Sequence, residues 1–248
     1  MTEDSLRVMT WNIHGRFLRD VESLAAEISK FAPHIIGLQE VHHHHATHLA
    51  ETLHMSSVWA FKHNPFWPVL RSRAEGLAIL SHHPIESREE VILSDSAHKR
   101  SHRRRLAIIA TIRVNTEIVT VVNTHLASHR DRNERLSQAE VLHRHMDRHI
   151  ATPWILTADL NDHNEPEIAE ALEGGTAHDA WTEQHGHRNG ATCPSSTPSM
   201  RIDHIIFSRE FPIEDVFVPE STETLRTLSD HLPVVAVTLV LGSDTHNP

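Results

Sequence analysis

The stretch "LSDHLPVVAV", residues 228–237, places an aspartate and a histidine directly before an apolar run near the end of the chain. The run is rich in valine, which favours a buried β-strand. Charged side chains at the mouth of a buried strand are costly unless they have a partner or a function. The polar residues at the ends of other strands indicate whether Asp230 and His231 have a structural partner or a function.

Polar side chains follow apolar strand patterns at several other places in the chain. A single such residue is ordinarily a turn former. If the strands lie in neighbouring sheets, however, their ends converge on one rim, and clustered carboxylates are unfavourable unless a cation neutralises them. The residues are Asn12 after "MTW", Glu40 after "IIGLQ", His125 after "VVNT", Asp159 and Asn161 after "WILTA", and Asp203 within "RIDHII".

The residue types in this set point to a hard metal ion and to hydrolysis. Oxygen ligands favour Mg²⁺, Mn²⁺ or Ca²⁺ over structural zinc. Glu40 and Asp230 can hold such an ion, and Asp203 can polarise His231. A metal, an oriented water and a cationic imidazole are what hydrolysis at phosphorus requires.

Strand and helix patterns predict a layered α/β protein with largely antiparallel sheets, because hairpins mix with helical crossovers without steady βαβ alternation. Residues 42–75 are interpreted as rich in loops. We expect one domain over residues 1–248, with a core at 5–241 and a polar tail at 242–248. Helices are predicted at 20–33 and 136–150, and strands at 6–11, 34–41, 75–81, 105–114, 117–127, 154–161, 201–207 and 232–241.

Composition restricts the classes of function. The 248-residue chain has a formal net charge of −10, which argues against a protein that coats nucleic acid nonspecifically but leaves room for a local basic site. No run approaches the roughly 20 apolar residues of a membrane helix, so we expect no stable membrane insertion. The single cysteine, Cys193, is compatible with a cytoplasmic location, which we predict.

Seven motifs resemble the endonuclease/exonuclease/phosphatase superfamily, the deoxyribonuclease I-like phosphoesterases. They are "TWNIHG", "GLQEV", "GLAILSHHPI", "VVNTHLAS", "LTADLND", "RIDHIIFS" and "LSDHLPVVA", in the order and approximate spacing of that superfamily across residues 7–238. The resemblance implies an α/β fold, a four-layer α-β-β-α sandwich of two mixed, largely antiparallel sheets flanked by helices. It places the active site at one rim of the sheets.

The resemblance also implies roles for individual residues. Glu40 looks like the principal Mg²⁺ ligand, with Mn²⁺ or Ca²⁺ as alternatives, and Asn12 and Asp230 look like supporting ligands. Asp159 resembles the group that orients or deprotonates the attacking water, assisted by Asn161.

Two histidines complete the implied site. His125, and His231 paired with Asp203, resemble the groups that contact the scissile phosphate and stabilise the transition state. The chain departs from some nuclease branches because it contains no tyrosine, whereas the loop at 62–75 offers Arg71 and Arg73 as substrate-binding residues.

Three further features keep two interpretations each. The basic run at 98–105, which ends in Arg104 and Arg105, fits either a grip on a polyanionic substrate or a solvated strand edge. The run "VHHHHATH" lacks the Asp-His of a zinc hydrolase and fits an exposed loop or a helix start with incidental transition-metal affinity. The aromatic residues that fit either a substrate wall or core packing are Trp59, Phe61, Phe66 and Trp67.

The sequence therefore predicts a divalent-metal-dependent phosphodiesterase acting on DNA or RNA. A phosphatase or a phospholipid or sphingomyelin phosphodiesterase of the same fold is the first alternative. A non-catalytic binding protein is the second alternative, and it is disfavoured because every site position carries a chemically competent residue.

Overall fold

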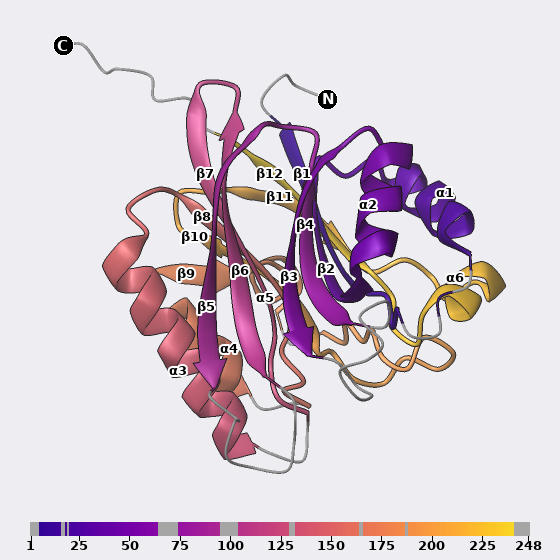
Figure 1. The fold of residues 1–248 in the computed structure, drawn as a ribbon. Helices are drawn as coiled ribbons and strands as arrows, with labels where there is room; N and C mark the ends of the chain where they lie inside the picture. Colours follow the sequence, from indigo (N-terminus) through magenta and orange to yellow (C-terminus); the bar gives the residue numbers. More distant parts are fainter. Residues whose placement is uncertain are drawn as a thin grey trace.

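Two six-stranded β-sheets pack face to face, with helices on both outer faces (Figure 1). The computed structural model describes residues 5–15, 18, 20–63, 74–94, 104–128, 132–163, 166–186 and 188–240. This arrangement confirms the predicted four-layer α-β-β-α sandwich.

The first sheet contains both ends of the described chain. Its strands, in spatial order, are β11 (Ile213–Phe217), β12 (Val234–Leu239), β1 (Ser5–Asn12), β2 (Ile35–His42), β4 (Glu75–Ser81) and β3 (Ser56–His63). The second sheet is formed by β5 (Ile85–Ser94), β6 (Arg105–Val114), β7 (Glu117–His125), β8 (Trp154–Asp159), β10 (Asp203–Ser208) and β9 (Ala177–Asp179).

Each sheet contains one parallel pair among its otherwise antiparallel strands. β1 pairs with β2 through the crossover helix α1 (Val21–Phe31), and β7 pairs with β8 through α3 (Arg132–His149). Parallel neighbours end at the same edge of their sheet. The polar residues that follow β1 and β2, and those that follow β7 and β8, are therefore brought together in two pairs.

Three apolar clusters hold the layers together. One lies between the sheets and includes Leu6, Ile108 and Phe207. The second packs the outer face of the first sheet against α1, α2 (His43–Thr52) and α6 (Glu223–Leu228), and the third packs the second sheet against α3 and α4 (Pro166–Glu173). The short helix α5 (Ala180–His185) follows β9.

The start of α1 agrees with the sequence prediction. The Asp20 side chain accepts a hydrogen bond from the backbone N–H of Ser23 at 2.9 Å, which satisfies one of the free donors of the first turn. Leu24 and Ile28 are buried on the inner face, and Ala32 ends the helix in the left-handed conformation before Pro33.

One expectation about local structure is wrong. The stretch 42–75 contains α2 and β3 in addition to residues outside the described part, because tertiary packing overrides the weak local pattern of a histidine-rich helix and an aromatic strand. The edge strand β5 was not predicted because six of its ten side chains are exposed and four of these are charged. The predicted polar tail at 242–248 lies outside the described residues.

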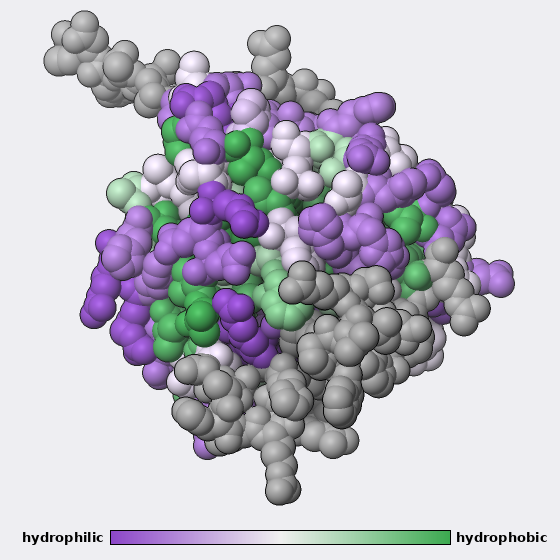
Figure 2. Space-filling model, in the orientation of Figure 1, coloured by the Kyte–Doolittle hydropathy of each residue, from purple (hydrophilic) through white to green (hydrophobic). Residues whose placement is uncertain are grey.

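The surface view supports an ordinary globular exterior. In Figure 2 hydrophilic side chains predominate among the coloured residues of the face that is shown, and hydrophobic ones appear in patches between them. Phe61 and Ile92 are the large apolar side chains exposed in the described ranges. In the same ranges, no helix is long and apolar enough to cross a membrane.

Candidate active site

Strand register places three predicted site residues side by side. His125, the last residue of β7, lies opposite Asp159 at the end of β8, and Asp159 lies opposite Asp203 at the start of β10. Residues opposite one another in a sheet project to the same face. All three are at least nine-tenths buried, so their charges interact in a weakly screened environment.

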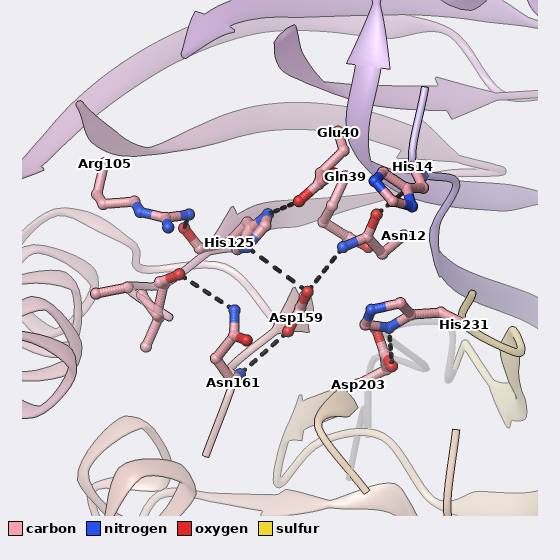
Figure 3. Close-up of polar contacts among 12 residues, drawn as sticks. Asn12, His14, Gln39, Glu40, Arg105, His125, Asp159, Asn161, Asp203 and His231 are labelled. Atoms are coloured by element: carbon pink, nitrogen blue, oxygen red, sulfur yellow. Dashed lines mark hydrogen bonds and ion pairs between the residues drawn. The ribbon is translucent and has the colours of Figure 1, made fainter. Parts of the chain in front are cut away.

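A hydrogen bond connects this row to the first sheet. The side-chain amide of Asn12, at the end of β1, donates to Oδ2 of Asp159 at 2.8 Å (Figure 3). The amide oxygen of Asn12 accepts from the backbone N–H of His14 at 3.1 Å. The rims of the two sheets therefore form one polar site.

Glu40 is positioned by an irregularity in β2. Its φ is 55°, in the left-handed region, and the pairing with β4 shifts register between Gln39 and Val41. Gly15 donates its backbone N–H to the Glu40 carbonyl at 2.9 Å, and a Cβ at this glycine would lie 2.3 Å from that oxygen. His14 and Asn161 also have positive φ, so unusual backbone conformations gather at this rim.

Glu40, Glu75 and His125 form the first cluster of possible metal ligands, with ligand atoms within 4.8 Å of one another. Glu40 Oε1 lies 3.8 Å from Nδ1 of His125. Glu75 projects from β4, and its Oε1 accepts a hydrogen bond from Lys62 at 3.0 Å. Glu75 was not predicted to be a site residue, although it directly precedes the motif "GLAILSHHPI".

The buried Lys62 organises this cluster. Its Nζ lies 2.9 Å from Nδ1 of His125, and the side chain is 1% exposed. Burial, followed by the nearby Arg105, lowers the Lys62 pKa to about 8. A protonated lysine only donates hydrogen bonds, so Nδ1 of His125 accepts and the ring hydrogen is on Nε2. Nε2 lies 3.6 Å from Oδ2 of Asp159.

Asp159, Asp203 and His231 form the second cluster. Nδ1 of His231 lies 2.8 Å from Oδ2 of Asp203, which also accepts a hydrogen bond from the Thr192 hydroxyl at 2.5 Å. Burial alone would lower the His231 pKa, but the Asp203 carboxylate outweighs it and raises the pKa well above the ordinary value. His231 is therefore held as a cation.

The backbone around His231 is fixed by further hydrogen bonds. The indole N–H of Trp11 donates to the His231 carbonyl at 2.9 Å. The hydroxyl of Ser229 accepts from the His231 N–H at 3.1 Å and donates to the Asn12 carbonyl at 2.6 Å. These contacts hold the Asp230-His231 pair, which precedes β12, against the end of β1.

Asp159 is the carboxylate with the most perturbed environment at the rim. Burial, and then the negative charge of Asp203, raise its pKa to about 7. Its Oδ1 accepts a hydrogen bond from the backbone N–H of Asn161 at 3.1 Å, and the Asn161 amide donates to the Leu126 carbonyl at 3.4 Å. Asp159 can therefore exchange a proton near neutral pH.

Asp230 lies on the more open side of the site. Its Oδ1 is 3.0 Å from Nδ1 of His14. His14 belongs to the motif "TWNIHG", but no role was predicted for it. The hydrogen bond to Asp230 raises the His14 pKa, and the charge of Glu40 adds to this effect. His14 thus lies between two of the predicted metal ligands.

The predicted substrate-binding arginines differ in their surroundings. Arg105 is 4% exposed and donates to the backbone carbonyl of His125 at 3.1 Å, so it supports the position of that residue. Arg104 lies 3.9 Å from Glu90 on β5. Arg71 and Arg73 lie outside the described residues, as do Phe66 and Trp67. Substrate contact by these arginines stays a prediction.

Two polar residues of α3 are buried, although polar side chains on a helix of this kind more often face solvent. Gln138 accepts a hydrogen bond from the Ala127 N–H at 2.9 Å, and Arg135 donates to the Ser128 carbonyl at 2.6 Å. Both residues have 0% exposure. These side chains fix the chain where it leaves β7 and the site.

Comparisons with known proteins give a family and a fold for the chain. A sequence model described as the endonuclease/exonuclease/phosphatase family matches residues 9–231. A search of curated proteins found no sequence match.

Three of the solved structures with the same fold share 20–23% sequence identity with the chain. An endonuclease/exonuclease/phosphatase from Beutenbergia cavernae DSM 12333 has a TM-score of 0.74 at 23% identity, over 96% of this chain and 72% of that one. The mannosyl-6-phosphatase Bt3783 of Bacteroides thetaiotaomicron VPI-5482 has 0.76 at 21%, over 95% and 100%. The human Nocturnin catalytic domain with bound sulfate has 0.75 at 20%, over 95% and 93%.

The match to the family model covers most of the chain and includes both clusters of the rim. Metal-dependent phosphoester hydrolysis is the chemistry of this superfamily. The chain belongs to the endonuclease/exonuclease/phosphatase family.

Proposed function

We propose that the chain is a Mg²⁺- or Mn²⁺-dependent phosphodiesterase that hydrolyses nucleic acid by in-line attack of water. The proposal rests on the hydrogen bond between Asn12 and Asp159. This bond connects the rims of the two sheets, so the carboxylates at both rims belong to one site. A cytoplasmic location remains a prediction from the sequence.

The donor groups at the rim fit a hard divalent cation. Glu40 and Glu75 offer carboxylate oxygens next to the buried Asp159 and Asp203. Oδ1 of Asp203 is buried without a hydrogen-bond partner among the described residues, and Asp159 has a raised pKa. These carboxylates therefore have too little positive charge near them to neutralise them, as a bound cation would.

In this proposal Glu40 is the principal metal ligand, and Asn12 and Asp230 support it. When bound, Mg²⁺ would cancel negative charge on the phosphoryl oxygens.

Asp159 and Asn161 are proposed to position the attacking water. The pKa of Asp159, raised to about 7 by burial, suits a group that accepts a proton near neutral pH. Two donors, the Asn12 amide and the Asn161 backbone N–H, fix the orientation of the carboxylate. Its position is therefore set before substrate arrives, which reduces the cost of reaching the transition state.

His125 and His231 are proposed to contact the phosphate. The Lys62 contact leaves a hydrogen on Nε2 of His125, which can donate to a phosphoryl oxygen. His231 is held as a cation by Asp203 and stabilises the negative charge that develops in the transition state.

A phosphomonoesterase is the second candidate. The net charge of −10 suits a small substrate better than a long polyanion. One of the similar solved structures is a mannosyl-6-phosphatase, and it is matched over its full length.

A substrate panel separates the candidates. Purified protein is treated with a chelator, resupplied with Mg²⁺ or Mn²⁺, and incubated with single- and double-stranded DNA, RNA, p-nitrophenyl phosphate, mannose 6-phosphate and sphingomyelin vesicles. The proposal expects metal-dependent cleavage of a polynucleotide. Turnover of the monoesters alone would support the second candidate, and turnover of sphingomyelin alone would support a lipid phosphodiesterase.

Glu40→Ala and His231→Ala are the matched variants for this panel. Each is expected to abolish turnover while circular dichroism shows an unchanged fold. Activity retained in both variants would refute the proposed site, and no turnover of any substrate by the parent protein would favour a binding protein.

A further inference from the structure

Three histidines gather where β2 ends and α2 begins. The ligand nitrogens of His42, His44 and His45 all lie within 4.8 Å of one another. The rings of His42 and His45 stack with centroids 5.0 Å apart, and those of His44 and His45 are 4.0 Å apart. Three histidines of the run "VHHHHATH", which lies outside the proposed catalytic site, thus form a compact group of imidazoles.

Local geometry selects three members of the four-histidine run. His42 is the last residue of β2 and has an extended backbone, and α2 begins at the next residue. His43 lies between the others in sequence but packs edge-on against Trp59, with centroids 5.0 Å apart and an interplanar angle of 84°. His43 is not part of the cluster.

Burial distinguishes this cluster from a surface patch. His42 and His45 are each 8% exposed, and Nδ1 of His45 is buried with no hydrogen-bond partner within the described part of the chain. A buried polar atom without a partner is unfavourable. His44 is exposed, which gives solvent and ions access to the group.

We propose that His42, His44 and His45 form a transition-metal site for Zn²⁺, or for Cu²⁺ or Ni²⁺, separate from the carboxylate site. Imidazole nitrogen suits these ions, whereas Mg²⁺ and Ca²⁺ prefer oxygen. Tetrahedral zinc with Zn–N bonds of about 2.0–2.1 Å places its ligand nitrogens about 3.4 Å apart. The nitrogens lie within 4.8 Å of one another, so binding would require the rings to rotate, and the exposed His44 is the member with the most room to do so.

The position of the site at the start of α2 indicates which kind of metal ion it would bind. The first turn of α2 contains no acidic residue, and the positive end of a helix dipole disfavours any cation. A hard ion held mainly by charge is therefore disfavoured, whereas a metal that forms coordinate bonds to neutral imidazoles is favoured. A bound metal would connect the end of β2, two residues after Glu40, to α2.

Metal titration of protein without an affinity tag tests the proposal. Chelator-treated protein is titrated with Zn²⁺ by calorimetry in excess Mg²⁺, and Cu²⁺ binding is followed by electron paramagnetic resonance. We expect one Zn²⁺ site that excess Mg²⁺ does not displace, and nitrogen hyperfine splitting from more than one imidazole. A Cu²⁺ spectrum with oxygen ligands alone would overturn the proposal.

Matched variants assign the site. His44→Asn changes an exposed side chain and is expected to weaken Zn²⁺ binding at least about tenfold, since even the loss of an outer partner of a metal ligand costs 10- to 100-fold. His43→Asn is the control from the same run and should bind as the parent does. Glu40→Gln should retain this Zn²⁺ site. Equal affinity in His44→Asn and the parent, or loss of binding in Glu40→Gln, would refute it.

Discussion

The side-chain amide of Asn12 donates a hydrogen bond to the carboxylate of Asp159 at 2.8 Å, and this bond joins β1 of one sheet to β8 of the other. Both residues are buried, at 3% and 1% exposure. The proposed metal-binding side and the proposed water-positioning side of the site therefore depend on each other.

Asn12→Ala is expected to lower kcat by about 10²-fold, because a displacement of about 1 Å at a catalytic group has an effect of that size. Asn12→Asp should be worse, since it places a second carboxylate against Asp159. Steady-state rates with the substrate identified in the panel, together with thermal unfolding, check both variants. Activity of Asn12→Ala within twofold of the parent would show that Asp159 is positioned by other contacts.

The charge of Asp203 is predicted to be essential for the role of His231. Asp203→Asn preserves the shape of the side chain but removes the charge that keeps His231 cationic, and kcat should fall by about 10²- to 10⁴-fold. Thr192→Val is the matched control, because it removes one hydrogen bond to Asp203 and leaves the charge. Comparable losses in the two variants would contradict the electrostatic explanation.

Much of this site could be predicted because its residues mark the ends of strands. Glu40, His125 and Asp159 each follow an apolar run, and parallel pairing of the runs brings the residues together. The local sequence pattern is sufficient to predict site residues at such positions, because the end of a strand is visible in the sequence. The residues next to it in space then follow from the order of the strands.

The burial of Lys62 and Arg135 was not predicted because their environments are created by distant segments. Lys62 lies on a strand within a stretch that was interpreted as loop, and its partner His125 is 63 residues away. Arg135 lies on an amphipathic helix, where a charged residue is expected to face solvent. Instead its guanidinium donates to the Ser128 carbonyl in the interior.

Lys62→Met is predicted to impair activity and stability through different contacts. Activity should fall because Nδ1 of His125 loses the donor that fixes its tautomer. Stability should fall because Glu75 loses its buried counter-charge, whereas removal of both members of a buried pair is often near neutral.

The double variant Lys62→Met/Glu75→Leu separates the two effects. Its urea midpoint should return toward that of the parent while its activity stays low. Recovery of activity together with stability would mean that Lys62 serves the fold alone.

Gly15→Ala is predicted to inactivate the protein by moving Glu40. A Cβ at this position would lie 2.3 Å from the Glu40 carbonyl oxygen, a backbone atom that a side-chain rotation cannot displace. Gly175→Asn is the matched control, since nothing lies within 4 Å of a Cβ there and asparagine tolerates its φ of 73°. Activity and melting temperature should fall in Gly15→Ala and stay near the parent values in the control.

A buried charge network beside the site predicts how stability depends on pH. Nδ1 of His204 lies 2.8 Å from Oδ2 of Asp179, and its Nε2 lies 3.1 Å from Oδ2 of Asp162. Burial alone would lower the His204 pKa, but the two carboxylates outweigh it and raise the pKa to about 9. Burial opposes the charge of Asp179 as well, but His204 and Arg201 lower its pKa below the ordinary value.

The signs of these shifts define a pH window. Because the His204 pKa is higher in the folded state, its contribution is complete below about pH 6.5 and is lost as the pH rises through about 9. The Asp179 pKa is lower in the folded state, so its contribution is present above about pH 4 and is lost in acid. The network should therefore stabilise the fold most between about pH 4 and 6.5.

Urea unfolding at pH 6, 7, 8 and 9 checks this prediction. The parent protein should lose on the order of 3 kcal/mol of unfolding free energy from this network across the range, the equivalent of the His204 shift. His204→Asn should be less stable at pH 6 because Asp162 and Asp179 lose the His204 cation, and it should lack this decline because asparagine does not titrate. His54→Asn, at an exposed position whose φ of 55° suits asparagine, is the control and should keep the slope of the parent. If His204→Asn and His54→Asn decline equally between pH 6 and 9, the decline arises from other groups.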